Sequence, residues 1–157
     1  MKIEIGQSAP LFALNSDENK EVKLSDLKGK NVVLYFYPKD DTPGCTIEAQ
    51  DFTKKSKEFK KLDCVILGVS RDNLVSHCKF IAKYKLNFNL LVDENSDLCE
   101  QYGVLKEKSM FGKKSIGIER STFLIDKLGK VQRIWRGVTV NGHVDEVLEE
   151  LVKNKIA

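Results

Sequence analysis

Residues 31–45, with the sequence NVVLYFYPKDDTPGC, decide the fold. Residues 31–37 form a continuous apolar, β-branched and aromatic run, which is typical of a strand buried on both faces of a sheet. Pro38 ends this run, and the loop KDDTPG follows it. From Cys45 to Lys61, apolar residues recur at helical spacing with charged residues between them. The stretch therefore predicts a buried strand, a short loop and an amphipathic helix that begins near Cys45.

The rest of the chain continues this alternation of strands and helices. The patterns predict short strands at 22–24 and 90–92, a buried strand at 64–70, and helices at 96–102, at 143–155 and from an N-cap at Asp72 to about Tyr84. They also predict a β-hairpin whose strands, 121–125 and 131–136, flank the turn DKLGK. The polar, glycine-containing stretch from Lys106 to Gly117 is interpreted as an exposed loop.

A β-α-β half followed by a β-β-α half is the order of the thioredoxin fold. We therefore predict an α/β protein with a thioredoxin-like fold, in which helices flank a central mixed β-sheet on both faces. The length of 157 residues suits one domain, which we expect to span residues 1–157.

Composition excludes several classes of protein. Hydrophobic residues make up 41% of the chain and charged residues 31%, which is typical of a globular protein. Lysine and arginine number 26 against 23 acidic residues, and a net charge of +3 is too small to predict binding to nucleic acid. The longest apolar run has about seven residues, whereas a membrane-spanning helix needs roughly twenty. With no stretch of signal-peptide type, we expect a cytoplasmic protein with neither membrane nor nucleic-acid partners.

Cys45 occupies a chemically informative position. It stands where a buried strand passes into a helix, at the sheet edge where α/β proteins usually place their sites. Unpaired backbone N–H groups and the helix dipole both favour a thiolate there, and the thiolate is the nucleophilic form of cysteine. Because a helix end alone stabilises an anion only modestly, we expect a cation beside this sulfur.

Arg120 is the best-placed cation. It directly precedes the strand predicted at 121–125, which in this fold lies beside the strand at 31–37. Its guanidinium is always charged and can donate to two atoms at once. Thr42, three residues before Cys45, can turn its hydroxyl toward the same point.

These residues carry a family resemblance. The segment PKDDTPGCT at 38–46 resembles the peroxiredoxin active-site motif, Pro-x-x-x-Thr-x-x-Cys. With the upstream LYFYP, Glu48, and GIERSTFLID at 117–126, the chain resembles the subfamily called bacterioferritin comigratory protein or PrxQ. The likeness covers nearly the whole chain.

The resemblance implies a function and a set of residue roles. Cys45 would be the peroxidatic cysteine, Thr42 and Arg120 would hold its thiolate and the peroxide, Pro38 would shield the site, and Glu48 would orient the arginine. The enzyme would reduce hydrogen peroxide and organic hydroperoxides to water and alcohols through a cysteine sulfenic acid, as an antioxidant. It would need no metal or organic cofactor. The implied reductant is thioredoxin or another thiol, and the implied state is a monomer.

One position departs from the subfamily pattern. Many members have a second, resolving cysteine five residues after the first, where this chain has Gln50. Either another cysteine or an external thiol must then resolve the sulfenic acid. Cys64 begins a strand about 20 Å from the active edge, which excludes it. Cys78 is the best candidate for the resolving cysteine, because its predicted helix starts at the same sheet edge as Cys45. Cys99 is a weaker candidate.

Simpler interpretations stay open for several residues. Cys78 shares a predicted helical face with Leu74 and Ile81 and can equally be a core residue. His77 and His143 lack ligand partners at suitable spacing, so we interpret them as surface or capping residues, and we assign Trp135 to packing.

Two other functions also fit the fold. A thiol-disulfide oxidoreductase would share the activated cysteine, but this chain has no Cys-x-x-Cys and no proline before residue 121. A non-enzymatic binding or chaperone module would have no use for the intact motif.

Overall fold

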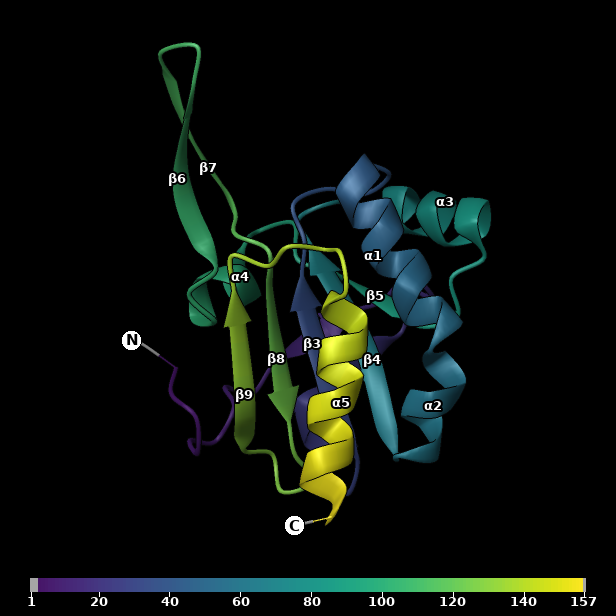
Figure 1. The fold of residues 1–157 in the computed structure, drawn as a ribbon. Helices are drawn as coiled ribbons and strands as arrows, with labels where there is room; N and C mark the ends of the chain where they lie inside the picture. The colour runs from purple at the N-terminus through teal and green to yellow at the C-terminus, as the bar shows by residue number, and fades with distance from the viewer. Residues whose placement is uncertain (1–2, 157) are drawn as a thin grey trace.

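A computed structural model of the protein describes residues 3–156 (Figure 1). In chain order its elements are β1 (Ala13–Asn15), β2 (Glu21–Lys23), the 3-10 helix η1 (Leu24–Leu27), β3 (Asn31–Phe36), α1 (Pro43–Lys54), α2 (Ser56–Lys61), β4 (Cys64–Ser70) and α3 (Leu74–Tyr84). They continue with β5 (Asn89–Val92), α4 (Asp97–Gln101), β6 (Leu105–Met110), β7 (Lys113–Ile118), β8 (Ser121–Ile125), β9 (Val131–Arg136) and α5 (His143–Ile156).

The central sheet has five strands in the order β5-β4-β3-β8-β9. Strand β3, the apolar run that begins at Asn31, lies in the middle, parallel to β4 and antiparallel to β8. The remaining pairs are β4 with β5, which is parallel, and β8 with β9, which is antiparallel. The predicted mixed sheet and its hairpin are confirmed, and the end of β3 that leads to Cys45 lies beside the start of β8.

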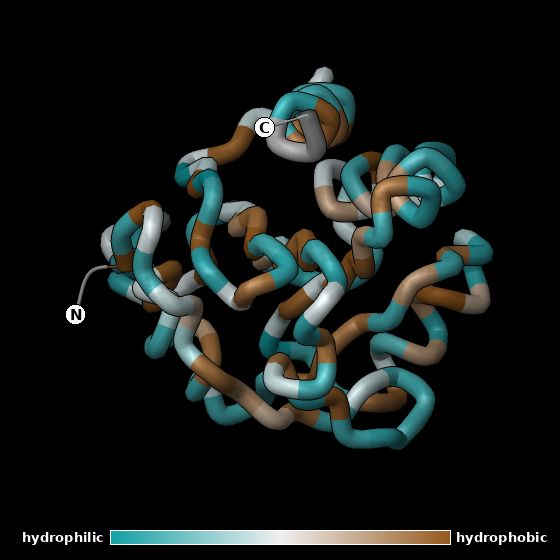
Figure 2. Tube along the Cα trace, turned by 90° about the horizontal axis from the view of Figure 1, so that it is seen from below, coloured by the Kyte–Doolittle hydropathy of each residue, from teal (hydrophilic) through white to brown (hydrophobic). Residues whose placement is uncertain are grey.

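Apolar residues pack on both faces of this sheet. On one face, the strands pack against buried residues of α1, α2, α3 and α5, represented by Phe52, Phe59, Phe80 and Val147. On the other face, they pack against η1 and α4, represented by Leu24 and Leu98. Figure 1 shows α1, α2 and α5 lying over the front of the sheet. In Figure 2, hydrophobic residues follow the strands in the interior, and hydrophilic residues dominate the outer turns.

The predicted helix from Cys45 to Lys61 is two helices in the structure. The chain bends at Lys55, the residue between α1 and α2, whose φ and ψ are −99° and 5°. Phe52 in α1 and Phe59 in α2 are both fully buried, with ring centroids 5.9 Å apart. Because these residues are seven positions apart, they share one face of a straight or a bent helix. The apolar pattern therefore could not reveal the bend.

The exposed loop predicted from Lys106 to Gly117 was wrong. This segment forms most of an antiparallel hairpin, β6 and β7, which projects from the body of the protein (Figure 1). Its turn consists of Phe111 and Gly112, both with positive φ, at 54° and 78°. Two successive positive φ angles are typical of a two-residue hairpin turn. Since the segment has few buried residues, it lacks the alternating pattern that identifies a strand.

The first turn of α3 also differs from the prediction. Its N-cap is Asn73 rather than Asp72, and the Asn73 side chain accepts a hydrogen bond from the backbone N–H of Ser76 at 2.9 Å. Asp72 points instead toward the loop that precedes α1, as described below. Within residues 3–156, no helix is long and apolar enough to cross a membrane.

Candidate active site

Cys45 lies in the first turn of α1, at the carboxyl end of β3. Thr42 is the N-cap, in an extended conformation, and Pro43 begins the helix. A proline suits this position because its missing N–H would have no helical partner there. Cys45 is then the third helical residue, close to the positive end of the helix dipole, and its side chain is only 1% exposed. The sulfur is therefore shielded from water but lies among donors that favour its anionic form.

The expected cation is present. The Nη2 atom of Arg120 donates to the Sγ atom of Cys45 at 3.4 Å, and its Nη1 atom donates to Glu48 Oε1 at 2.7 Å. Arg120 lies between β7 and β8, so the pairing of β8 with β3 brings it to the start of α1. One guanidinium thus joins the thiol to a carboxylate on the next turn of the same helix. A group with several donors can contact a sulfur and a carboxylate together, which a lysine does less well.

Glu48 is completely buried, and its second carboxylate oxygen has no hydrogen-bond partner among residues 3–156. Burial raises the pKa of Glu48 to about 7, although the charge and hydrogen bond of Arg120 act in the opposite direction. A buried carboxylate that is only half satisfied is costly unless its cation stays in place. The pair therefore restricts the guanidinium to a narrow range of positions beside Cys45.

Thr42 and Pro38 both belong to the segment of residues 38–44, which we call the peroxidatic loop after the role that the sequence predicts for it. The Thr42 hydroxyl donates to the backbone carbonyl of Lys39 at 2.8 Å, and the Thr42 carbonyl accepts the N–H of Thr46 at 2.9 Å. The hydroxyl thus closes the loop on itself in this structure rather than bonding to Cys45. Pro38 is half-buried directly after the last buried residue of the strand run, Tyr37.

Cys64 and Cys99 are buried far from this chemistry. Cys64 begins β4 opposite Asn31, at the end of the sheet away from Cys45, and burial raises the pKa of its thiol to about 12. Cys99 lies in α4 on the other face of the sheet, and burial together with Asp93 raises the pKa of its thiol well above the usual value. Neither sulfur becomes a thiolate near neutral pH, so neither is suited to attack an oxidised Cys45.

Cys78 is on the surface of α3, so its alternative interpretation as a core residue was wrong. Its thiol donates to the backbone carbonyl of Asp17 at 3.1 Å. The residues of α3 that contact the peroxidatic loop include instead Ser76, His77 and Lys83. A bond between Cys78 and Cys45 would therefore require α3 or α1 to unwind locally.

The interpretation of both histidines as surface or capping residues was also wrong. His77 is fully buried and hydrogen-bonded to Asp40 and to the backbone of Leu91, at 2.7 and 2.8 Å. His143 is 3% exposed, and its Nε2 atom is 2.8 Å from the Thr122 hydroxyl. A polar residue in the first turn of a helix gives no sequence signal for burial when its partner is distant in the chain.

Trp135 packs edge-on against His143, and Arg133 lies over its ring, in agreement with the predicted packing role.

Asp40 belongs to a polar cluster that the pattern did not predict. Atoms of Asp40, Asp72 and His77 that could ligate a metal lie within 4.8 Å of one another. The protein's own hydrogen bonds already engage these groups, because His77 Nδ1 bonds to Asp40 and Asp72 accepts from Ser70 and from the backbone of Asp40. The only sequence signal was the pair of aspartates in the KDDTPG loop.

Comparisons with known proteins agree with this geometry. The profile of the AhpC/TSA family matches residues 5–134. Peroxiredoxin Bcp of Bacillus subtilis is 55% identical over 151 residues, which cover 96% of both chains. A putative peroxiredoxin bcp of Coxiella burnetii is 52% identical over 96% of this chain and 100% of its own length.

Solved structures show the same similarity. The bacterioferritin comigratory protein of Xanthomonas campestris, studied for its alkyl peroxide reduction activity, is 44% identical with a TM-score of 0.88 over 92% of each chain. A PrxQ mutant of Xylella fastidiosa is 39% identical with a TM-score of 0.93 over 98% of each chain.

A buried helix-end cysteine beside an arginine, on a thioredoxin-like fold, defines a cysteine-dependent peroxidase of the peroxiredoxin class. The chain belongs to the AhpC/TSA family and, within it, to the Bcp or PrxQ subfamily. It is a thiol-dependent peroxidase, which excludes the thiol-disulfide oxidoreductase and the binding module as its main activity.

Gly44 offers a sharp test of the arginine contact. A Cβ atom at this position would lie 3.1 Å from Arg120 Nη2, so the guanidinium would have to move away from the sulfur. We expect Gly44→Ala to lower the rate of peroxide reduction about three- to tenfold. Because alanine favours helix, stability should stay unchanged or rise by up to about 1 kcal/mol. Stopped-flow kinetics and urea unfolding measure the two effects.

The control for Gly44→Ala is the same substitution in an Arg120→Met background. If the effect acts through the guanidinium, the second substitution causes no further loss of rate. Additive losses would show that Gly44 acts by another route.

Proposed function

We propose that Cys45 is the peroxidatic cysteine and that Arg120, Thr42 and Pro38 form its site, with Glu48 orienting the arginine. The observation that carries this proposal is the 3.4 Å contact from Arg120 Nη2 to Cys45 Sγ in a water-excluded first helical turn. The substrates are hydrogen peroxide and organic hydroperoxides.

The reaction needs only groups of this chain and the peroxide. The Cys45 thiolate attacks the near oxygen of ROOH, so that an S–O bond forms as the O–O bond breaks. Sulfur is oxidised by two electrons to a sulfenic acid, and the leaving alkoxide or hydroxide takes up a proton to give ROH or water. The Arg120 guanidinium can stabilise the charge that moves from sulfur to the leaving oxygen. The Thr42 hydroxyl reaches the peroxide if it rotates away from Lys39.

The sulfenic acid must then react with a thiol. We propose Cys78 for this step, since it is exposed, whereas Cys64 and Cys99 are buried with strongly raised pKa values. Its thiol condenses with the sulfenic acid to form a Cys45–Cys78 disulfide and water after local unwinding of α3. Thioredoxin or another thiol then reduces the disulfide. We also propose that the chain acts as a monomeric, single-domain enzyme of the cytoplasm.

Oxidation with one equivalent of hydrogen peroxide, followed by non-reducing peptide mass spectrometry, tests these assignments. We expect a linked Cys45–Cys78 peptide in the wild type and a Cys45 sulfenic acid in Cys78→Ser. Cys99→Ser is the matched control and should behave as the wild type. If the wild type forms only a sulfenic acid and no linked peptide, an external thiol rather than Cys78 resolves the sulfenic acid. An unmodified Cys45 would contradict the proposed site as a whole.

A further inference from the structure

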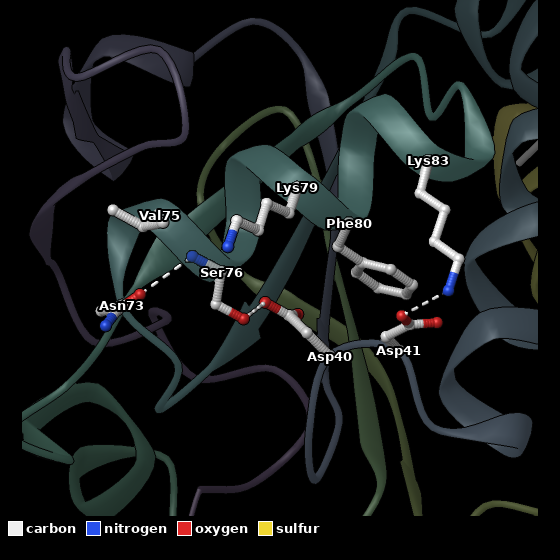
Figure 3. A pocket seen from close by; sticks show the side chains of 8 residues that line it. All are labelled: Asp40, Asp41, Asn73, Val75, Ser76, Lys79, Phe80 and Lys83. Carbon is white, nitrogen blue, oxygen red and sulfur yellow. Dashed lines mark hydrogen bonds and ion pairs between the residues drawn. The ribbon is translucent and has the colours of Figure 1, made fainter.

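Two consecutive aspartates fasten the peroxidatic loop to helix α3. Asp41 is at the surface, where its carboxylate accepts from Lys83 Nζ at 2.8 Å and from the Tyr84 hydroxyl at 2.5 Å. Asp40 is 7% exposed and accepts from the Ser76 hydroxyl at 2.8 Å. Figure 3 shows both aspartates facing α3. Together with residues of α3 they line a groove of about 490 Å³. The loop that leads to the nucleophile thus depends on α3 for its position.

The buried carboxylate of Asp40 has three side-chain donors. The Tyr37 hydroxyl donates to Oδ1 at 2.5 Å, while the Ser76 hydroxyl and His77 Nδ1 lie 2.8 and 2.7 Å from Oδ2. A carboxylate in the interior is costly unless a positive charge lies nearby.

His77 supplies that charge. Its Nε2 atom is 2.8 Å from the carbonyl oxygen of Leu91, which can only accept a hydrogen bond. Its Nδ1 atom faces the Asp40 carboxylate, which is also an acceptor. Both ring nitrogens must then carry a proton, so His77 is an imidazolium. This side chain is fully buried, and with Asp40 it forms an interior ion pair.

The network around this pair joins the loop to β4, β5 and the end of β3. The backbone N–H of Asp40 donates to Asp72 Oδ2 at 2.8 Å, and the same oxygen accepts from the Ser70 hydroxyl at 2.6 Å. Tyr37 follows β3, Ser70 ends β4, and the Leu91 carbonyl belongs to β5. Asp40 is therefore fixed through both its backbone and its side chain, five residues before Cys45.

We propose that the buried His77–Asp40 ion pair positions the peroxidatic loop for attack on peroxide, so that His77 is a positioning residue of the reaction. This inference rests on the proposed role of Cys45. His77 contacts neither the sulfur nor the peroxide, and it acts through Asp40. Loss of the pair removes the buried ionic contact between the loop and α3 and leaves the surface contacts of Asp41, so that Cys45 and the Thr42 backbone keep less of the geometry that in-line attack requires.

The proposal predicts a dependence on pH. Burial by itself lowers the pKa of His77, but the hydrogen bond and charge of Asp40, the Leu91 carbonyl and the charge of Asp72 raise it above 6.5. Tyr37 also faces the pair through Asp40, and it stays neutral because burial raises its pKa well above 10. A raised histidine pKa stabilises the fold fully below about pH 6.5, and this contribution is lost as pH rises through the folded-state pKa.

The test is His77→Gln, assayed in single turnovers with hydrogen peroxide and a sulfenic-acid reagent. We expect the second-order rate constant for Cys45 oxidation to fall about tenfold or more at pH 7. The ratio of wild-type to variant rate constants, which cancels the ionisation of Cys45, should decrease toward one as pH rises. The reaction of preformed sulfenic acid with added thiol should not slow, because that step benefits from a freer loop. A general folding defect would slow both steps.

His143→Gln is the matched control. His143 is also buried and hydrogen-bonded, but burial lowers its pKa to about 4, so it stays neutral over the whole pH range of the assay. Any rate loss in this variant should not vary with pH. If His77→Gln does not fold, Ser76→Ala serves as the test variant. This substitution removes a neutral donor to Asp40 and keeps His77. It should lower the oxidation rate about two- to threefold and keep the wild-type pH profile.

The outcomes separate this inference from the proposed function. An oxidation rate constant of His77→Gln within twofold of wild type, or a loss that does not vary with pH, overturns the positioning role. If His77→Gln does not fold, an oxidation rate equal to wild type in Ser76→Ala overturns it. If the wild type itself forms no Cys45 sulfenic acid, the assignment of Cys45 fails, and the positioning role fails with it.

Discussion

Cys45→Ser is expected to lower the rate of hydroperoxide reduction at least about 10³-fold, the largest effect of any single substitution in this chain. A serine hydroxyl stays protonated near neutral pH, and within the described part of the chain the side chain hydrogen-bonded to this position is Arg120 rather than a base. The Arg120 guanidinium can only donate, so it stabilises an anion but removes no proton. The site would keep its shape and lose its nucleophile.

The measurement for Cys45→Ser is the rate of peroxide consumption with a thiol reductant in excess. Cys64→Ser and Cys99→Ser are matched controls, since each removes a buried thiol outside the site. Both should retain peroxidase activity, although their stability will fall. Retained activity in Cys45→Ser would show that another cysteine is the nucleophile.

Arg120→Met should have the second-largest effect, a loss of about 10²- to 10³-fold in the rate constant for oxidation by peroxide. Methionine fills much of the same space but cannot donate to Cys45 or to the departing oxygen. The rate constant of Arg120→Lys should lie between those of Arg120→Met and the wild type, because an ammonium group supplies a positive charge but cannot donate to two atoms in the geometry of a guanidinium.

The same substitution should change stability in a manner that depends on pH. Without Arg120, the pKa of buried Glu48 rises further above the value of about 7 that it has in the wild type. A carboxyl whose pKa is raised in the folded state destabilises the fold progressively as pH rises from its unfolded-state pKa to its folded-state pKa, so a further rise of the folded-state pKa extends this loss to higher pH. We expect Arg120→Met to be destabilised by about 1–3 kcal/mol, with the difference from wild type small below pH 6 and larger above pH 7.

The double variant Arg120→Met/Glu48→Gln tests the cause of this instability. Removing the carboxylate should abolish the pH-dependent part of the difference in unfolding free energy, while the peroxidase activity stays lost. A stability difference that persists unchanged would mean that packing of the arginine, rather than the unpaired Glu48, is responsible.

Patterns of neighbouring residues account for most of what could be predicted. Strand β3 is indicated by six apolar residues before a proline, and α1 by helical spacing after a proline and a glycine. These patterns express which faces of a strand or helix are buried, a property set within a few residues. The position of Cys45 at a helix end follows from them directly. The role of Arg120 needed one further step, the expectation that β8 lies beside β3.

The errors share a physical cause. The β6–β7 hairpin is exposed and polar, so burial imposes no alternation on its strands. The bend at Lys55 leaves the apolar face continuous. His77 and Cys78 are adjacent in α3. The prediction placed His77 at the surface and allowed Cys78 to be a core residue, whereas in the structure His77 is buried and Cys78 is exposed. Helical spacing gives the relative directions of these side chains but does not identify which direction is the interior.

Local sequence thus determined the alternation of strands and helices, the position of Cys45 at a helix end and the class of chemistry, because each depends on interactions between near neighbours. Tertiary structure alone decided which charges meet. Arg120 and Glu48 are 72 residues apart, His77 and Asp40 are 37 apart, and the thiol of Cys78 bonds to a carbonyl 61 residues away. Such contacts depend on where the folded chain returns to itself, and the cost of burying an unpaired charge selects the partners that remain.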